Sequence, residues 1–430
     1  MKKSFFCGLM SVILFSAISC SGGRSNMTEE YLPAFVQSHF TKPSSSLSAE
    51  VDLFVDYSTC VATASTSDFY NATHPAIVDC NPNFYSIKGR NIKFETNNRE
   101  QVYTLLRTIR EVNNADLKQA VHQIVNGNHQ AVIITDGEYF PNNIVADNLN
   151  NPYLAPEFRT WLKKGLDIYI YSEPYLESNR FNKFRYYIIF TDDKMEDNLN
   201  EKFYRNAPDA SSVLVLHLTA DAPKLDKKSK IVFNQIFNPT KLAEDVYALD
   251  LSWRDMETLL KDEDDYIFRG LKVEMKPEDV YKVDEVEPVV YQLYSPYEEY
   301  VDSLALSDKK ILADVSSLRE LEDVFEIDEK VFKKSGEIVL KLDDDFYEDL
   351  SVDHENVLRV DFVVDEAEDN FTRNEDLNRG FKWTSIARSN GHAPNTSVYQ
   401  SISQVVSEPS MNPGRNKKVI ATVYLYTSQY

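Results

Sequence analysis

The chain has 430 residues, of which 43% are hydrophobic and 12% aromatic, and its formal net charge is −22 at pH 7. This length supports two or three packed domains, and the composition is typical of a globular protein rather than a disordered one. The strong negative charge argues against nucleic acid and against an anionic membrane surface as direct partners.

The first 20 residues have the features of a secretory signal. Lys2 and Lys3 precede an apolar stretch from Phe5 to Phe15, which is too short to span a bilayer. Small residues then lead to Cys20, a pattern that resembles a bacterial lipobox. The resemblance implies removal of a signal peptide over 1–19 and a diacylglyceryl lipid on Cys20; an uncleaved signal anchor is the alternative. We therefore expect a protein of the bacterial cell envelope that meets the membrane through its lipid alone, with the outer membrane favoured and the facing side left open.

Residues 20–50 are rich in serine and glycine, as in a flexible tether. From residue 51 strands alternate with helices, which predicts an α/β domain over 51–222 with a doubly wound, mostly parallel sheet. Residues 61–90, which contain Pro75 and Pro82, carry no predicted element. The expected elements are strands 51–56 and 91–95, helices 99–112 and 116–125, strand 131–135, helix 158–164, strands 167–171 and 186–191, helix 198–205 and strand 212–218.

A polar segment at 224–230 marks a linker, and the sequence beyond it changes in character. Short runs with strand propensity recur, which predicts a β-rich region over 223–430 that comprises one or two modules. The expected strands are 231–237, 272–275, 289–293, 338–342, 357–364 and 419–426, and helices are expected only at 255–260 and 317–325.

Two of the strands in the α/β half deliver an aspartate at their carboxyl ends. The apolar run 51–56 ends in Asp56, and the apolar run 131–135 is followed by Asp136. Runs of this kind are typical of strands buried on both faces, and ligand sites in open α/β sheets form beyond the carboxyl ends of the strands. The pattern predicts a site for a divalent cation or a polar ligand.

The segments Asp56-Tyr-Ser58-Thr-Cys60 and Thr135-Asp136-Gly137 resemble motifs of the von Willebrand factor A-like family, over about residues 50–220. In that family the first strand ends in Asp-x-Ser-x-Ser and a later strand in Thr-Asp-Gly. The resemblance implies a degenerate metal-ion-dependent adhesion site, in which Asp56, Ser58 and Asp136 hold Mg²⁺ or another divalent cation that ligates a partner's carboxylate. Cys60 replaces the second serine, and Ala115 stands where the family has a metal-binding threonine.

Structural alternatives remain open for the same residues. Asp56, Ser58 and Asp136 can instead cap helices and hydrogen-bond turns. An exported compartment permits a disulfide between Cys60 and Cys80, and two free buried thiols are the alternative.

Motifs of catalysis are missing from the sequence. There is no histidine pair with metal-ligand spacing, no Gly-x-Ser-x-Gly elbow and no phosphate-binding glycine loop. We therefore expect a non-enzymatic protein that binds a protein partner or ligand in the cell envelope. A scaffold subunit of an envelope complex without metal is the alternative, and a metal-dependent hydrolase is the third possibility.

Overall fold

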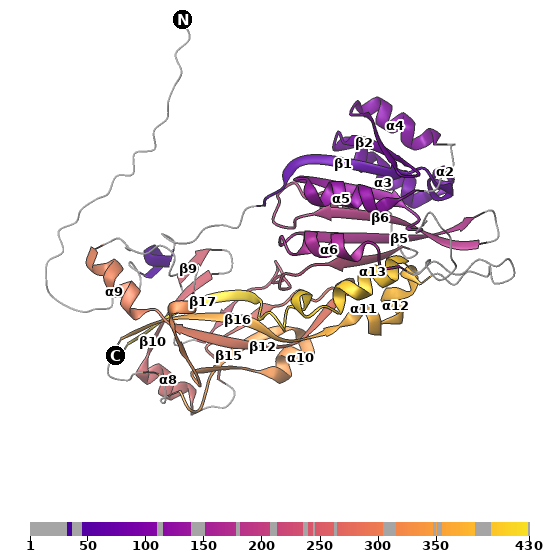
Figure 1. The fold of residues 1–430 in the computed structure, drawn as a ribbon. Helices are drawn as coiled ribbons and strands as arrows, with labels where there is room; N and C mark the ends of the chain where they lie inside the picture. The colour runs from indigo at the N-terminus through magenta and orange to yellow at the C-terminus, as the bar shows by residue number, and fades with distance from the viewer. Residues whose placement is uncertain are drawn as a thin grey trace, which may run out of the picture.

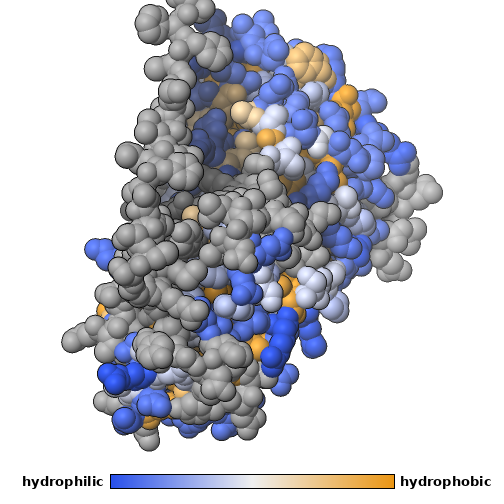
Figure 2. Space-filling model, turned by 90° about the vertical axis from the view of Figure 1, so that its left-hand side faces the viewer, coloured by the Kyte–Doolittle hydropathy of each residue, from blue (hydrophilic) through white to orange (hydrophobic). Residues whose placement is uncertain are grey.

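The computed structural model describes residues 32–36, 45–109, 115–138, 151–177, 181–206, 213–234, 240–243, 246–261, 265–303, 315–346, 350, 355–382 and 397–428. The predicted signal peptide and Cys20 lie outside these residues. Among the helices it describes, none is long and apolar enough to cross a membrane. Seen from the left-hand side of Figure 1, the surface of the described residues is mostly hydrophilic (Figure 2), in keeping with the high net charge.

The first half is built on a seven-stranded sheet in which β1 lies at the centre, between β2 and β4 (Figure 1). β1 runs parallel to both of these neighbours, whereas β3, β6 and β7 run antiparallel to the strands beside them. In spatial order the strands are β3 (Asn91–Thr96), β2 (Asn83–Lys88), β1 (Ser48–Asp56), β4 (His129–Thr135), β6 (Phe181–Thr191), β5 (Asp167–Glu177) and β7 (Leu214–Leu218).

The α/β class is confirmed, but the prediction of a mostly parallel sheet is wrong. No helix separates β5 from β6, so β6 turns back as the second arm of a hairpin and inserts between β4 and β5. A parallel neighbour would require a crossover connection of a dozen or more residues. The sheet is consequently mixed, with parallel pairing confined to β2, β1 and β4.

Helices cover both faces of this sheet (Figure 1). On one face α3, α4 and α7 pack on the side chains of Leu53, Val55 and Val132, and on the other α5 and α6 pack on Phe54 and Ile133. The stretch 61–90, for which no element was predicted, contains the end of α2, η1, α3 and β2. The helices are α2 (Thr59–Ala62), η1 (Ala64–Thr66), α3 (Asp68–Asp79), α4 (Arg99–Thr108), α5 (Leu117–Asn126), α6 (Ala155–Leu162) and α7 (Leu199–Asn206).

The second half is β-rich and contains two further sheets whose apolar faces share one core. The six-stranded sheet has the order β13 (Arg319–Leu321), β12 (Tyr281–Gln292), β16 (Asn356–Asp369), β17 (Val419–Ser428), β10 (Val246–Ser252) and β9 (Thr240–Ala243). The four-stranded sheet has the order β14 (Phe325–Ile327), β15 (Glu337–Leu342), β11 (Phe268–Lys272) and β8 (Val232–Phe233). The helix predicted at 317–325 is wrong, because β13 and the start of β14 occupy it, and the strand predicted at 272–275 meets β11 only at Lys272.

Helices of the second half lie among the strands and, at the C-terminal end, on the first sheet. Phe371, Phe381, Val398 and Ile402 belong to the same buried cluster as α5 and α6. The core of the first sheet is therefore completed by residues from beyond position 223. These helices are α8 (Trp253–Leu259), α9 (Tyr294–Ser303), η3 (Val315–Ser317), α10 (Glu329–Ser335), α11 (Asn370–Arg373), α12 (Glu375–Asn378), η4 (Arg379–Phe381), α13 (Ser397–Val406) and η6 (Pro409–Met411).

Part of the predicted tether is folded. Residues 32–36 form a short helical segment, and its Leu32 and Phe35 are fully buried against the six-stranded sheet and α9. The tether expected over 20–50 is thus interrupted by a docked segment.

Candidate functional site

The carboxyl ends of β1 and β4 bring Asp56 and Asp136 together. The two strands pair in parallel with Val55 opposite Ile134, so their carboxyl ends lie at the same edge of the sheet. One ligand atom from each of Asp56, Cys60 and Asp136 lies within 4.8 Å of the others. Asp56 and Asp136 are 2% and 5% exposed, and Ser58 is 8% exposed. The three residues expected to hold a cation therefore line one buried edge of the sheet.

Thr135, the first residue of the Thr135-Asp136-Gly137 segment, organises this edge. Its hydroxyl donates to Asp56 Oδ2 at 2.7 Å and accepts the backbone N–H of Gly137 at 2.9 Å. Gly137 has φ +67°, and a Cβ on it would clash with Val398 of α13. Only glycine fits this turn without strain, and the tight turn keeps Asp136 next to Asp56. The motif Thr-Asp-Gly is thus explained residue by residue.

The charge of the aspartate pair is compensated only in part by the residues around it, because burial outweighs the hydrogen bonds to Asp56 and the charge of Lys183 near Asp136. Asp56 Oδ1 has no hydrogen-bond partner among the described residues. Burial raises the pKa of Asp56 to about 7, against the hydrogen bond from Thr135. Burial and the charge of Asp56 raise the pKa of Asp136 well above its usual range. Two buried carboxylates this close do not both ionise unless a cation joins them.

Neighbouring cations are committed to other carboxylates. Lys183 lies 2.6 Å from Glu138, and the buried Arg185 lies 2.6 Å from Glu173. Arg185 also donates through Nε to the carbonyl oxygen of Cys60 at 2.7 Å, which fixes the turn that carries Ser58 and Cys60. This buried ion pair positions the loop after β1 but adds no net charge to the site.

Cys60 and Ala115 stand at the other two positions where the resemblance implies oxygen ligands, and neither supplies a side-chain oxygen. Cys60 Sγ lies 3.0 Å from Ser58 Oγ, and burial together with the two aspartates raises the pKa of the Cys60 thiol. Ala115 forms a parallel bridge with Gly89 and offers no side-chain oxygen. The donors present, two carboxylates and a hydroxyl, fit a hard divalent cation that keeps several waters, and the thiol does not.

The predicted disulfide between Cys60 and Cys80 is not present, and both thiols are free. Cys60 is buried in α2, whereas Cys80 follows α3 and donates through Sγ to the carbonyl of Ala76 at 3.3 Å.

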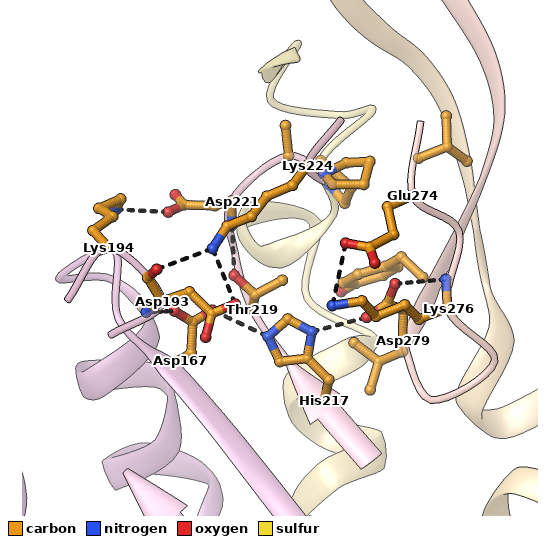
Figure 3. Close-up of a pocket in the computed structure, with 16 residues that line it drawn as sticks. Asp167, Asp193, Lys194, His217, Thr219, Asp221, Lys224, Glu274, Lys276 and Asp279 are labelled. Atoms are coloured by element: carbon orange, nitrogen blue, oxygen red, sulfur yellow. Dashed lines mark hydrogen bonds and ion pairs between the residues drawn. The ribbon is translucent and has the colours of Figure 1, made fainter. Parts of the chain in front are cut away.

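A second cluster of buried charges surrounds His217 near the end of β7 (Figure 3). The His217 ring makes contacts of 3.1 Å from Nε2 to Asp167 and of 2.8 Å from Nδ1 to Asp279. Burial alone would lower the pKa of His217, but the hydrogen bonds to the two aspartates raise it to about 10. The ring also stacks on Tyr169 with centroids 4.2 Å apart. His217 is therefore a charged histidine held between the first half and the second.

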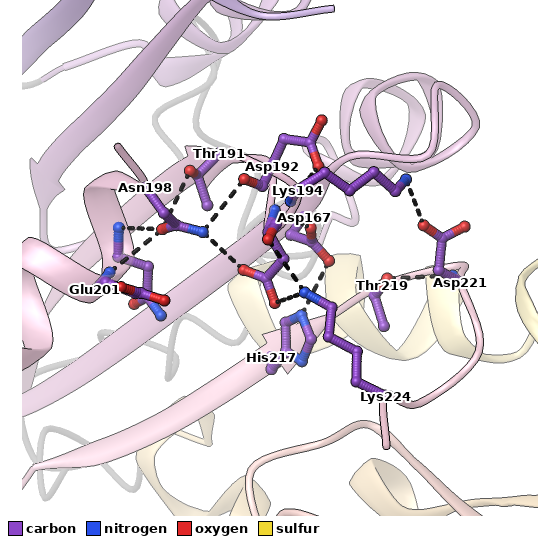
Figure 4. A network of polar contacts seen from close by, with 12 residues as sticks. Asp167, Thr191, Asp192, Lys194, Asn198, Glu201, His217, Thr219, Asp221 and Lys224 are labelled. Atoms are coloured by element: carbon purple, nitrogen blue, oxygen red, sulfur yellow. Dashed lines mark hydrogen bonds and ion pairs between the residues drawn. The ribbon is translucent and has the colours of Figure 1, made fainter. Parts of the chain in front are cut away.

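Every acid in this cluster has a partner (Figure 4). Asp193 accepts hydrogen bonds from Tyr169 Oη at 2.8 Å and from Asn198 Nδ2 at 2.9 Å, and it forms an ion pair with Lys224 at 3.1 Å. At the rim, Lys194 pairs with Asp221. The pocket that the cluster lines therefore carries acids and bases that pair with one another, and none of its buried side-chain oxygens and nitrogens lacks a hydrogen-bond partner among the described residues.

Comparison of the chain with family models, with curated proteins and with solved structures gave no match.

Proposed function

We propose that this protein is a lipid-anchored component of the bacterial envelope that binds a protein partner through its N-terminal α/β half. A divalent cation at Asp56, Ser58 and Asp136 orders the loops that form the binding surface. The observation that carries this proposal is the pair of buried aspartates at adjacent strand ends, with one oxygen unpaired. Such a pair is stable either with a shared proton or with a cation between its members.

A von Willebrand A-like arrangement for this half is part of the proposal. It is supported by the strand order β3-β2-β1-β4, by helices on both faces, and by aspartates that follow β1 and β4. The hairpin of β5 and β6 departs from the mostly parallel sheet expected of that family. The departure borders the proposed site, because β6 pairs with β4 up to Thr135 and its Arg185 donates to the carbonyl oxygen of Cys60. The carboxyl ends of β1 and β4 nevertheless keep Asp56 and Asp136 side by side.

The chemistry that the cation supplies is positive charge and open coordination positions for a carboxylate. Mg²⁺ suits the donors because it prefers oxygen ligands and is commonly held by one or two protein carboxylates together with water. The ligand residues are nearly covered, so a partner's carboxylate reaches the cation only when the loops after β1 and β4 part. That same burial favours the second candidate function, a scaffold subunit in which the aspartate pair shares a proton and binds no metal.

Thermal unfolding of the mature chain without its lipid separates the two functions. Binding to the native state alone raises stability by about 2.7 kcal/mol when the free cation is at 100 times its dissociation constant. We expect Mg²⁺ or Mn²⁺ to raise the Tm relative to a chelator. Asp136→Asn should abolish this rise while leaving the Tm in chelator equal or higher, because it relieves the repulsion from Asp56.

Asp52→Asn is the matched control. Asp52 lies on β1, as Asp56 does, but it hydrogen-bonds with Asn83 and His129 away from the site. The variant should keep the full response to cation. A Tm that no cation moves, or a response that survives Asp136→Asn, would rule out the cation site and leave the scaffold function.

A further inference from the structure

The docked segment 32–36 determines which end of the molecule is tied to the membrane. Leu32 and Phe35 are fully buried and Val36 is 2% exposed. The Phe35 ring packs edge-on against Tyr297 and Tyr300, each with centroids 5.5 Å away. Burial of these apolar side chains stabilises the docked position of the segment. The remaining buried members of the cluster are Ala248, Leu293, Val357, Tyr424 and Tyr426.

All of these partners belong to the second half of the chain. They come from β10, β16, β17, and α9 with the residue before it. In Figure 1 the indigo segment lies beside β9, and α2 with the carboxyl end of β1 lies at the opposite end of the molecule. Segment 32–36 thus precedes the first half in the sequence but packs on the second half.

Docking shortens the connection to the anchor. Leu32 is 12 residues from Cys20, whereas Ser48, where β1 begins, is 28 residues from it. A fully extended chain spans at most about 3.4 Å per residue, so the reach is about 40 Å to Leu32 but about 95 Å to β1 without docking. The docked segment therefore holds the second half close to the lipid and removes the freedom of the first half to approach it.

We propose that the β-rich second half is the membrane-proximal part of the protein, and that the Asp56–Asp136 edge faces away from the anchoring membrane. The partner is then a protein that approaches this edge from the side away from the anchoring membrane, not a protein embedded in that membrane. This proposal rests on the lipid anchor of the proposed function, and it reverses the order that the sequence suggests, in which the α/β half follows the tether directly.

The chemistry of the membrane-proximal end fits a tethered body rather than an adsorbed one. α9 carries Glu298, Glu299 and Asp302 and no basic residue. Anionic lipids repel such a helix. The described surface on this side is mostly hydrophilic, with hydrophobic residues scattered over it (Figure 2). The short chain from Cys20 to Leu32 sets the distance to the bilayer.

Energy transfer to a labelled bilayer tests this orientation. The chain from Cys20 onward is coupled through the Cys20 thiol to a maleimide lipid in phosphatidylcholine vesicles, with Cys80→Ser so that only buried Cys60 remains besides it. A donor dye is placed by a non-canonical amino acid either at Glu298 in α9 or at Thr66 in η1, both exposed, and acceptor lipids are added. We expect several-fold stronger transfer from position 298 than from position 66.

The double variant Leu32→Ala with Phe35→Ala should remove this difference by freeing the longer tether. Tyr204→Ala, which truncates an aromatic ring that is 67% exposed, is the matched control and should preserve it. Equal transfer from both positions in the parent chain, or stronger transfer from position 66, would overturn the proposal even if the double variant does not fold.

The chemical lipid keeps this test independent of the proposed function. Mass spectrometry of Cys20 from native membranes decides whether the cell attaches an acyl anchor, and the cation melts decide the binding site. A failed orientation test with an acylated Cys20 would leave the anchor standing and reject only the arrangement. An unmodified Cys20 would reject both the anchor and the membrane-proximal end that rests on it.

Discussion

Two buried clusters of acidic side chains lie at opposite edges of the same seven-stranded sheet, and they differ in how their charge is balanced. Asp56 and Asp136 follow the carboxyl ends of β1 and β4. Asp167 begins β5 and His217 lies near the end of β7, at the other edge. At the first edge an oxygen of Asp56 has no partner among the described residues. At the second edge each of Asp167, Asp193 and Asp279 pairs with a histidine or a lysine.

The difference distinguishes the proposed ligand site at Asp56 and Asp136 from a structural junction at His217. Burying a charge is costly unless a partner compensates it, so a cluster that is complete in itself has no need of a ligand. The His217 cluster is complete because the chain supplies both signs of charge, and it joins the first half to the second through Asp279. The Asp56 cluster has only the partial compensation of Lys183 near Asp136, and the proposed cation would supply the rest.

Removal of the His217 charge should produce the largest effect. His217→Gln keeps some hydrogen bonding but leaves Asp167 and Asp279 buried without their cation, which should cost about 3–5 kcal/mol. Urea unfolding of the mature chain measures the loss. His122→Gln is the matched control, because the His122 side chain is 65% exposed. Equal, small losses in both variants would mean that the His217 cluster does not depend on its charge, and the contrast between the two edges would fail.

The pH dependence of the same cluster should sharpen the contrast. The pKa of His217 is raised to about 10 in the folded state by its two aspartates, against about 6.5 in an unfolded chain. The folded state therefore holds the proton more tightly, and its stabilising effect is complete below pH 6.5 and disappears as the pH rises through 10. In urea titrations from pH 6 to 10 the parent should lose its advantage over His217→Gln. A gap between them that stays constant would contradict the assignment of a charged His217.

The sequence predicted the strand ends well because continuous apolar runs are a strong local signal. β1 and β4 lie where the runs 51–56 and 131–135 placed them, and their aspartates lie together. Adjacency followed from the rule that parallel strands end at one edge. The sequence also indicates the hairpin of β5 and β6, because two strand-like runs without a helix between them favour antiparallel pairing. α3 was missed because Pro75 lies inside it and proline ordinarily interrupts a helix.

The side chains around each cluster could not be predicted in the same way. His217 is 50 residues from Asp167 and 62 residues from Asp279, so no spacing rule connects them. Arg185 reaches the carbonyl of Cys60 over 125 residues. Such contacts depend on the order of strands in the sheet, and that order was the part of the fold that the sequence left open. Ser67 caps α3 and is the local feature that could have located this helix.

The smallest expected effect concerns Cys60, which occupies the position where the family resemblance places a second serine. Its thiol is fully buried beside Ser58, and burial together with the neighbouring aspartates raises its pKa and keeps it protonated. A neutral thiol is a poor ligand for a hard cation, whereas a hydroxyl in its place adds an oxygen. Cys60→Ser should therefore strengthen Mg²⁺ binding by up to about tenfold, or about 1.4 kcal/mol.

The measurement is the Mg²⁺ concentration that gives half of the full rise in Tm, compared between the parent and Cys60→Ser. Cys80→Ser, at a half-buried thiol away from the aspartates, controls for the loss of sulfur. If Cys60→Ser lowers the Tm in chelator and leaves the Mg²⁺ midpoint unchanged, Cys60 only fills the core. A lower midpoint would mean that the edge near Asp56 binds a cation and that the sulfur of Cys60, in place of an oxygen, weakens the binding. The two clusters would then differ in the metal ligands they offer as well as in how their charge is balanced.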